Sequence, residues 1–447
     1  MSSYVPYKAY KASHVAWLDE IPAHWSVSSL RWLSTRYSGG TPDRENPDFW
    51  SEGSIPWLNS GAVNEPVIHK PSAYISETGF ASSSAKWIPQ GALVLALAGQ
   101  GKTKGTVAQL GFSATCNQSM AALIPTGRVD ARYLFWWLRS NYTNVRSMSG
   151  GDLRDGLNLQ LLGDIPVPLP SPNEQRAIVD FLDRETAQID ELIIKQERLI
   201  ELLVEKRQAI ITHAVTKGLD PTAPTKPSGI PWLGDMPNHW TTSRLKWTGP
   251  TQESGTSVNG MDTPAGPDEL GVLKTGAVSK GYFVPEANKT VLPEDVERVT
   301  CPVRMGTLIV NRANTPDLVG STGRTPNDAP LLFLSDKLWQ IDFERAHTDF
   351  IYWWSKTDVY RSQIQFRRVG ASSSMQNLSY PDFLTVDIAL PSLEEQQITA
   401  GYLDDRTASI DLLKDKAQSV IVLLRERRSA LISAAVTGKI DVREGVA

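Results

Sequence analysis

The chain has 447 residues, of which 41% are hydrophobic and 21% charged, and its formal net charge is −4. This length allows two or three globular domains, and the composition excludes a disordered chain. The longest apolar runs, such as residues 93–98, are too short to cross a bilayer, and residues 1–11 lack the apolar segment of a signal peptide. We therefore expect a cytoplasmic protein without a membrane partner, in which any contact with nucleic acid comes from local basic patches.

The first predicted element is a short opening segment, residues 17–32, that returns at residues 232–247. WLDEIPAHWSVSSLRW aligns without a gap with WLGDMPNHWTTSRLKW, displaced by 215 positions. Repetition of this kind indicates a duplicated domain. The repeated Pro-x-His-Trp turn favours a structural role over a catalytic one for His24 and His239.

Each opening segment leads into a domain with mixed secondary structure. Short strands are predicted at residues 92–98, 121–125 and 307–310, and a helix is predicted around each tryptophan pair, 136–137 and 353–354. The pattern indicates an α+β domain in each half. We assign the four tryptophans to core packing, because tryptophan-rich segments are more often core than platforms for stacked bases.

Polar stretches that are poor in acids provide candidate DNA contacts in both halves. Residues 99–111 carry lysines and no acid, and residues 361–380 carry three arginines followed by serines and amides. Arginine can pair with guanine or phosphate through two hydrogen bonds, and Gln or Asn can do the same with adenine. Solvated surface without a ligand is the alternative. The candidates are Lys102, Lys104, Arg146, Arg154, Asn158, Arg312, Arg324, Arg361, Arg367, Arg368, Gln376 and Asn377.

Patterns that would indicate catalysis are incomplete. Gly101, Lys102 and Thr103 resemble the end of a phosphate-binding loop, but Ala96 stands where that pattern needs glycine and no helix is predicted afterwards. Residues 46–49 differ from the Asn-Pro-Pro-Phe pattern of amino-group methyltransferases, and no G-x-G-x-x-G precedes them. The two cysteines fall at non-equivalent places and the six histidines do not cluster. We expect no catalytic residues, no metal site and two buried free thiols.

The longest repeat covers residues 169–220 and 390–441, displaced by 221 positions without a gap. Each copy contains a long stretch of helix-forming residues in which apolar positions recur every seven residues, which is typical of a coiled-coil seam. Forty-odd helical residues span roughly 60 Å, so each helix is expected to act as a spacer. Arg207 with Arg428, and Thr186 with Thr407, occupy equivalent polar seam positions that would fix the register.

Apolar residues also lie on the outer helix faces. Leu192, Leu199, Leu413 and Val420 are a candidate docking surface for a partner protein, and additional packing between the two helices is the alternative.

The predicted fold class is α+β, with two similar globular domains separated by two long antiparallel coiled-coil helices in a pseudo-two-fold internal repeat. The domains are expected at residues 1–168 and 225–389, the helices at 169–217 and 390–440, and a Pro- and Gly-rich linker at 218–231. Two similar domains with different loops suggest two similar docking tasks on a polymer with a repeat. Duplex DNA fits, because paired modules on it sit roughly 34 Å apart.

These repeats resemble the specificity subunit, HsdS, of type I restriction-modification systems over nearly the whole chain. The resemblance rests on W-L-x-x-x-P-x-H-W at the start of each domain, on L-P-x-x-x-E-Q at Glu174-Gln175 and Glu395-Gln396, and on the helix after it. NQSMAALIP at residues 117–125 also resembles a recurring segment of these domains, whereas LSDKLWQID at 334–342 departs from it.

The resemblance implies an adaptor without catalysis of its own. Each target recognition domain would read one half of a bipartite, asymmetric site on double-stranded DNA, and the helices would set the gap. Two methyltransferase subunits would dock beside the helices and recruit restriction and translocase subunits. S-adenosylmethionine, ATP and Mg²⁺ are expected only in those partners. The alternatives are the recognition subunit of a fused nuclease-methyltransferase enzyme and a nucleotide hydrolase that uses the Gly101-Lys102-Thr103 loop.

Overall fold

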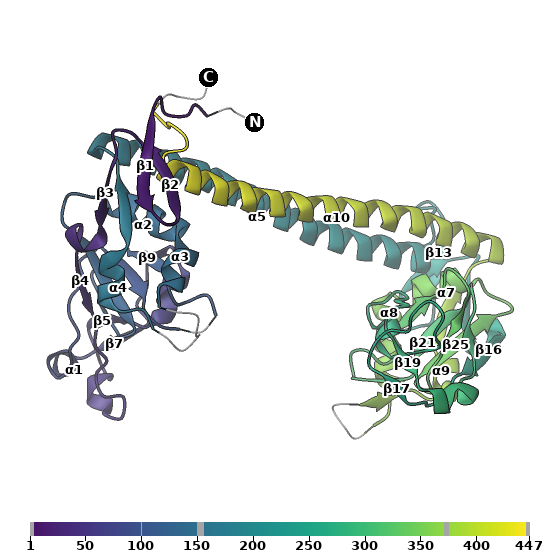
Figure 1. Ribbon diagram of the computed structural model, residues 1–447. Helices are drawn as coiled ribbons and strands as arrows, with labels where there is room; N and C mark the ends of the chain where they lie inside the picture. Colours follow the sequence, from purple (N-terminus) through teal and green to yellow (C-terminus); the bar gives the residue numbers. More distant parts are fainter. Residues whose placement is uncertain (1–3, 100, 150–155, 371–374, 444–447) are drawn as a thin grey trace. The chain divides into compact units, whose positions relative to one another are not determined.

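The chain is described by a computed structural model for residues 4–99, 101–149, 156–370 and 375–443. It divides into two compact units, the first formed by residues 1–196 and 419–447 and the second by residues 197–418 (Figure 1). Two long helices, α5 (Pro172–Lys217) and α10 (Leu393–Val436), each contribute to both units. Each unit therefore joins one globular domain to one part of a helix pair.

The globular domain of unit 1 is built around a five-stranded sheet in the order β4-β11-β8-β9-β6. Its central strand β8 is a continuous apolar run whose residues are all buried, as expected for a strand covered on both faces. A three-stranded sheet, β10-β5-β7, lies in the same domain. The strands are β4 (Ser34–Ser38), β5 (Ile55–Leu58), β6 (Val67–Ile68), β7 (Ala73–Ile75), β8 (Leu93–Ala96), β9 (Val107–Leu110), β10 (Thr115–Cys116) and β11 (Met120–Pro125).

Short helices and a strand pair complete this domain. Helix α2 (Ala131–Ser140) buries Trp136 and Trp137 and begins at Asp130, whose carboxylate accepts hydrogen bonds from two backbone N–H groups of its first turn. The remaining elements are β3 (Ser26–Ser29), which pairs with β12 (Pro166–Leu169), and the helices α1 (Glu77–Ala81), α3 (Tyr142–Ser147) and α4 (Leu159–Asp164).

The globular domain of unit 2 repeats this plan with a different division of strands. A four-stranded sheet has the order β16-β25-β21-β23, and a five-stranded sheet has the order β17-β19-β18-β24-β20. The strands are β16 (Pro250–Ser254), β17 (Gly260–Met261), β18 (Gly271–Leu273), β19 (Asn288–Val291), β20 (Pro302–Val303), β21 (Leu308–Asn311), β23 (Thr322–Arg324), β24 (Ala329–Phe333) and β25 (Leu338–Phe343). Helix α7 (Thr348–Trp354) buries the second tryptophan pair.

Further elements of unit 2 mirror those of unit 1. Strand β15 (Thr241–Arg244) pairs with β27 (Asp387–Leu390) as β3 pairs with β12. The others are β22 (Ala313–Asn314), β26 (Gln376–Asn377), α6 (Gly276–Ser279), α8 (Asp358–Arg367) and α9 (Tyr380–Leu384). Gly91 and Gly306 precede β8 and β21 with φ angles of 82° and 77°, so the turn before the central strand needs glycine in both units.

A short β-hairpin precedes each domain. In unit 1 it is formed by β1 (Tyr10–Val15) and β2 (Leu18–Pro22), and in unit 2 by β13 (Thr225–Pro227) and β14 (Asp235–Pro237). The segment expected as a linker, residues 218–231, therefore carries a strand, and Ile230 packs in the core cluster that contains Trp240. Pairing of β13 with β14 satisfies backbone groups that a free linker would leave to water.

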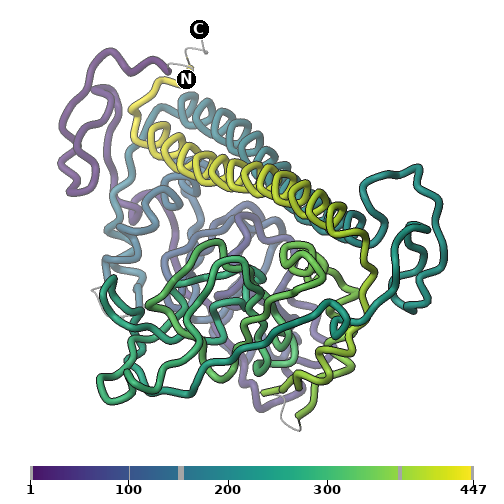
Figure 2. The backbone as a smooth tube through the Cα atoms, turned by 90° about the vertical axis from the view of Figure 1, so that its right-hand side faces the viewer, coloured from purple at the N-terminus to yellow at the C-terminus, as the bar shows by residue number. Residues whose placement is uncertain are grey.

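The two long helices pack side by side and antiparallel, as Figures 1 and 2 show. Asp190 of α5 pairs with Arg428 of α10 in unit 1, and Arg207 of α5 pairs with Asp411 of α10 in unit 2. The residue numbers of both pairs add up to 618, so one antiparallel register holds in both units. Most of the seam residues expected from the seven-residue repeat are buried, among them Leu182, Ile189, Ile193, Leu203, Leu403, Ile410 and Ile421. Four others are half-buried: Val179, Ile200, Ile210 and Leu424.

The polar seam residues divide into two kinds. The hydroxyls of Thr186 and Thr407 donate to the carbonyls of Leu182 and Leu403 within their own helices, at 2.6 and 2.7 Å. Arg207 and Arg428 instead bridge the two helices. The arginines therefore mark the register between the helices, whereas the threonines satisfy only local backbone groups.

Candidate DNA interface

The repeated opening motif and the repeated Glu-Gln motif meet where each domain joins its helix. In unit 1, the ring nitrogen Nε2 of His24 lies 2.7 Å from Oε1 of Glu174, and Ser171 donates to Oε2 of the same carboxylate. Burial alone would raise the pKa of Glu174, but these hydrogen bonds outweigh it and hold the pKa below its ordinary value. In unit 2, Glu395 binds His239 at 2.9 Å. Both histidines therefore make a contact that links the opening segment to the long helix.

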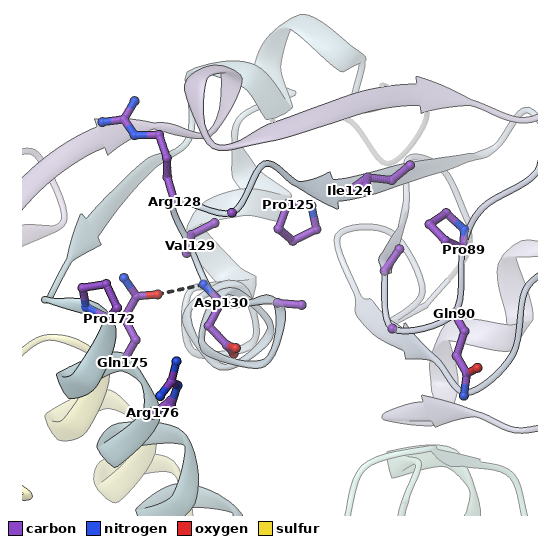
Figure 3. A pocket seen from close by; sticks show the side chains of 14 residues that line it. Pro89, Gln90, Ile124, Pro125, Arg128, Val129, Asp130, Pro172, Gln175 and Arg176 are labelled. Carbon is purple, nitrogen blue, oxygen red and sulfur yellow. Dashed lines mark hydrogen bonds between the residues drawn. The ribbon is translucent and has the colours of Figure 1, made fainter.

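The glutamine of the same motif ties the long helix to the start of a domain helix. The side-chain carbonyl of Gln175 accepts from the backbone N–H of Asp130 at 2.8 Å, and its amide donates to the carbonyl of Pro170. Figure 3 shows this bond at the edge of a cavity of about 420 Å³ whose charged lining is Arg128, Asp130 and Arg176. Gln396 makes the equivalent bonds in unit 2, to the backbone N–H of His347 and the carbonyl of Pro391.

An aspartate on each long helix holds the tryptophan pair of the domain. In unit 1, Asp183 accepts from the indole N–H of Trp136 at 2.9 Å and pairs with Arg132 at 3.0 Å. The guanidinium of Arg428 of α10 lies 5.9 Å from the centre of the Trp136 ring. A buried indole, two guanidinium groups and a carboxylate therefore fix the domain on the helix pair.

In unit 2, the equivalent aspartate is Asp404, which accepts from the indole N–H of Trp353 at 2.9 Å. Its cation comes from a strand rather than from the tryptophan helix, because Asp349 stands where unit 1 has Arg132. Arg324 of β23 fills the gap and pairs with Asp404 at 2.8 Å and with Asp349 at 3.3 Å. Direct contact of Arg324 with DNA would require both ion pairs to break, so we exclude it from the candidate interface.

The described candidate residues of unit 1 lie around the loop after β8, at residues 97–99 and 101–106. Lys102 is exposed, and its carbonyl accepts from the hydroxyl of Tyr142. Arg146 donates to the carbonyl of Lys104 at 3.2 Å, and the N–H of Leu157 donates to the carbonyl of Leu97. Asn158 follows and caps helix α4 through its side chain. One face of the domain thus combines three segments that are distant in the sequence.

Two candidates of unit 1, Lys104 and Arg154, are not among the exposed residues that the structure describes on this face. Lys104 is only 4% exposed, so its side chain does not offer a free charge to a large ligand. Arg154 lies outside the described residues.

The corresponding face of unit 2 is formed by the loop after β21 and by residues 368–370 and 375–378. The N–H of Leu378 donates to the carbonyl of Arg312 at 2.8 Å, which repeats the bond between Leu157 and Leu97. Strand β26, which contains Gln376 and Asn377, pairs with β22 in this loop. Asn377 is exposed, and Nη1 of Arg368 is buried without a hydrogen-bond partner in the described part of the chain.

Two arginines of the composition-based set are used within the fold. Arg361 donates to the carbonyls of Val319 and Pro316, both at 2.6 Å, and so braces the loop after β21. Arg367 donates to the hydroxyl and the carbonyl of Thr385. Both act as supports for the candidate face rather than as free cations on it.

The expected docking residues are exposed. Leu192, Leu199, Leu413 and Val420 are 45%, 42%, 50% and 39% exposed, so they do not pack between the helices. The sequence interpretation missed one further pair of exposed apolar residues. Trp32 and Trp247, at equivalent positions of the two units, are 66% and 62% exposed. The signal was present, since both tryptophans end the repeated opening segment.

The structure also shows the surroundings of the two cysteines and of the Gly101-Lys102-Thr103 segment. Cys116 is buried and Cys301 half-buried, and burial raises the pKa of each thiol to about 12. Among the described residues, no group of three or more His, Cys, Asp or Glu side chains could hold a metal ion, and no described helix combines the length and apolarity needed to span a membrane. The Gly101-Lys102-Thr103 segment leads into strand β9, not into a helix.

Comparison with known proteins shows which proteins the chain resembles. The "Type I restriction modification DNA specificity domain" matches residues 22–202. A specificity subunit from Methanocaldococcus jannaschii, that of the type I restriction enzyme MjaVIII, is 22% identical over 95% of this chain and 94% of its own length. The chain is similar to the specificity subunits of type I restriction-modification systems over nearly its whole length.

Other family members match over shorter regions. The specificity subunit of the Escherichia coli enzyme EcoR124I/EcoR124II is 29% identical over 33% of this chain, and that of MjaIX is 26% identical over 42%. The matches span 37% and 42% of the length of these two relatives.

Solved structures share the fold. A chain from a type I R-M system, solved in a study of complex assembly and conformational transition, has a TM-score of 0.71 at 16% identity, covering 94% of this chain and 99% of its own. The HsdS subunit from Thermoanaerobacter tengcongensis has a TM-score of 0.56 at 17% identity, covering 94% of this chain and 98% of its own.

Proposed function

We propose that this chain is the DNA-reading subunit of a type I restriction-modification complex and has no catalytic activity of its own. Each globular domain reads one half of a bipartite, asymmetric site, and the helix pair sets the gap between the halves. The observation that carries the proposal is the repeated face: the bond from Leu157 to Leu97 recurs from Leu378 to Arg312, whereas the side chains around it differ. The same geometry with different side chains suits two different half-sites.

The candidate contacts that lie on these two faces differ between the units, although several of their side chains also make hydrogen bonds within the fold. In unit 1 they are Lys102, Arg146 and Asn158, and in unit 2 they are Arg312, Arg368, Gln376 and Asn377. Amide side chains are found mainly in unit 2, which favours adenine contacts there, whereas the cations of unit 1 favour phosphate or guanine. This difference supports an asymmetric site.

We further propose that two methyltransferase subunits dock on the exposed apolar helix positions, one in each unit. Leu192 and Val420 belong to unit 1, and Leu199 and Leu413 belong to unit 2. Each unit therefore offers one such position from each helix, which suits two copies of one partner. S-adenosylmethionine, ATP and Mg²⁺ would be bound by the methyltransferase subunits and by the restriction and translocase subunits that they recruit.

Methylation mapping of host DNA tests the function. Comparison of cells with and without the gene is expected to show adenine methylation at a motif of two unlike halves with a gap between them. A continuous palindrome would contradict the proposal. Purification of the tagged chain with its bound partners tests the alternative of a fused nuclease-methyltransferase enzyme. Separate methyltransferase and nuclease polypeptides support this proposal, whereas one fused polypeptide supports the alternative.

Insertion of one heptad-equivalent into α5 or α10 tests the role of the helix pair. The insertion displaces the arginine-aspartate register in one unit, so the mapped gap is expected to change or DNA binding to be lost, while surviving half-sites stay the same. An unchanged gap with full binding would show that the helices do not set the spacing.

The nucleotide-hydrolase alternative has its own test. Strand β9 follows the Gly101-Lys102-Thr103 segment, so a helix N-terminus that could bind phosphate is missing there. The purified chain is expected to show no ATPase activity. ATPase activity that is lost in Lys102→Ala, with DNA binding retained, would favour the hydrolase.

A further inference from the structure

Unit 1 contains a cavity of about 830 Å³ between the globular domain and helix α10. The domain side is formed by the loop after β8, the end of α2 and the start of α3, and the helix side by residues 428–433. Three cations line it, Lys102, Arg139 and Arg428, together with hydroxyl groups that include Ser140 and Ser433, and no acid is among the lining residues. A cavity with this lining attracts an anion.

Arg139 carries the strongest indication. Its guanidinium lies 5.6 Å from the centre of the Phe135 ring, and no carboxylate of the described chain lies within ion-pair distance of it. Burial, followed by repulsion from Arg428, lowers the pKa of Arg139. A half-buried guanidinium that lacks an acidic partner is costly, and an anionic ligand would offset that cost.

The equivalent cavity of unit 2, of about 710 Å³, differs in its charges. Lys356 occupies the place of Arg139, since both follow their tryptophan pair by two residues, and its ammonium donates to the carbonyl and the hydroxyl of Thr322 at 2.7 and 2.6 Å. Asp404, Asp405 and Asp411 also line this cavity. The cations of unit 2 are therefore balanced by the protein itself. In unit 1, Arg428 is paired with Asp190, whereas Arg139 has no ion-pair partner among the described residues.

We infer that the cavity of unit 1 binds a phosphate group of the DNA backbone, with Arg139 as its main ligand and Lys102 as a supporting charge. This inference rests on the proposed function. Guanidinium and hydroxyl groups together suit phosphate oxygens. DNA is favoured over a free nucleotide because the exposed Lys102 belongs both to this cavity and to the loop that forms the candidate DNA face. The contact fixes the position of the duplex against unit 1 without reading its sequence.

The test measures the salt dependence of DNA binding by the full chain, co-purified with its methyltransferase subunits. The probes are a fluorescent duplex that carries the mapped site and a scrambled duplex. Loss of one phosphate contact reduces the slope of log K against log salt by about 0.9. Arg139→Gln is therefore expected to weaken binding to both duplexes by a similar factor and to reduce the slope by about this amount.

Three variants control for unfolding and for general loss of charge. Arg139→Lys keeps the charge and should restore most of the slope. Lys356→Gln removes the equivalent cation of unit 2, whose hydrogen bonds are internal, and should leave the slope unchanged. Ser433→Glu places a carboxylate in the cavity from the helix side and should reduce the slope without altering Arg139. Thermal unfolding of each variant verifies that it is folded.

The outcomes separate the inference from the proposed function. If the wild-type complex fails to bind DNA, the proposed function is wrong and the inference falls with it. If the wild type binds its site but folded Arg139→Gln keeps the wild-type slope, the inference alone is wrong. Calorimetric titration with ATP tests a free nucleotide as the ligand. ATP binding that depends on Arg139, with an unchanged salt dependence of DNA binding, would assign the cavity to a free nucleotide and overturn the inference.

Discussion

In both units an aspartate of a long helix holds the globular domain, but the arginine that pairs with it comes from a different element in each. In unit 1, Arg132 of the tryptophan helix pairs directly with Asp183 of α5. In unit 2, Asp349 occupies that helix position, and Arg324 from a strand pairs with both Asp349 and Asp404. The indole-aspartate bond is kept in both, so the bond to the long helix is the constant part of the contact and the source of the cation is variable.

Removal of the tryptophan is expected to have the largest effect on this contact. Trp136→Ala and Trp353→Ala each delete a buried indole and its hydrogen bond to the helix aspartate, at a cost of about 3–5 kcal/mol in the free energy of unfolding. Urea denaturation, followed by hydrogen exchange in each unit, measures the loss. Equal protection of both units in either variant would show that the two units do not depend separately on these tryptophans.

Removal of the arginine that pairs with the helix aspartate is expected to cost less stability, and the cost is expected to differ between the two units. Arg324→Ala leaves Asp349 and Asp404 close together without a cation, whereas Arg132→Ala leaves only Asp183, which keeps its bond to Trp136. We expect losses of about 1–2 kcal/mol for Arg324→Ala and under about 1 kcal/mol for Arg132→Ala, because these side chains are partly exposed. Urea midpoints compare the two.

A second change checks the reason for this difference. Addition of Asp349→Asn to Arg324→Ala removes one of the two unpaired charges and should recover part of the stability. Equal losses for the two arginine variants, or no recovery in the double variant, would contradict the repulsion argument.

The smallest effect concerns pH and the Glu174 contact. The pKa of Glu174 lies below its ordinary value of 4.5, so its contribution to stability is present above that pH and is lost as the pH falls through it towards the lowered value. Glu174→Gln should therefore be less stable than the wild type at about pH 7, and the difference should shrink by about pH 4. Urea midpoints at both pH values test this, with Glu395→Gln as the matched variant in unit 2. A difference that stays constant would contradict the expectation.

Much of the fold could be predicted because its main elements occur twice in the sequence. The seven-residue apolar repeat predicted helices that the structure places at Pro172–Lys217 and Leu393–Val436, and the apolar run at 92–98 predicted the central strand. The repeated Pro-x-His-Trp and Glu-Gln motifs could be seen in the sequence, but their meeting could not, because about 150 residues separate His24 from Glu174.

The candidate site was harder to predict than the fold. Composition marked Arg361 and Arg367 as free cations, whereas both donate to groups of the surrounding loops. It also missed Arg139, since an arginine among apolar helix residues carries no signal until the structure shows the missing acid. Local composition does not specify which side chains satisfy the backbone of an irregular loop.

The constant aspartate on each long helix has a consequence for how such a gene can change. Each domain carries its own tryptophan and its own cation, and the helices present the same aspartate, glutamate and glutamine to both. Recombination that replaced one domain between its two junctions would therefore meet an unchanged partner surface on the helices. A lineage could acquire a new globular domain in one genetic exchange while it inherits the other domain and the helix pair intact.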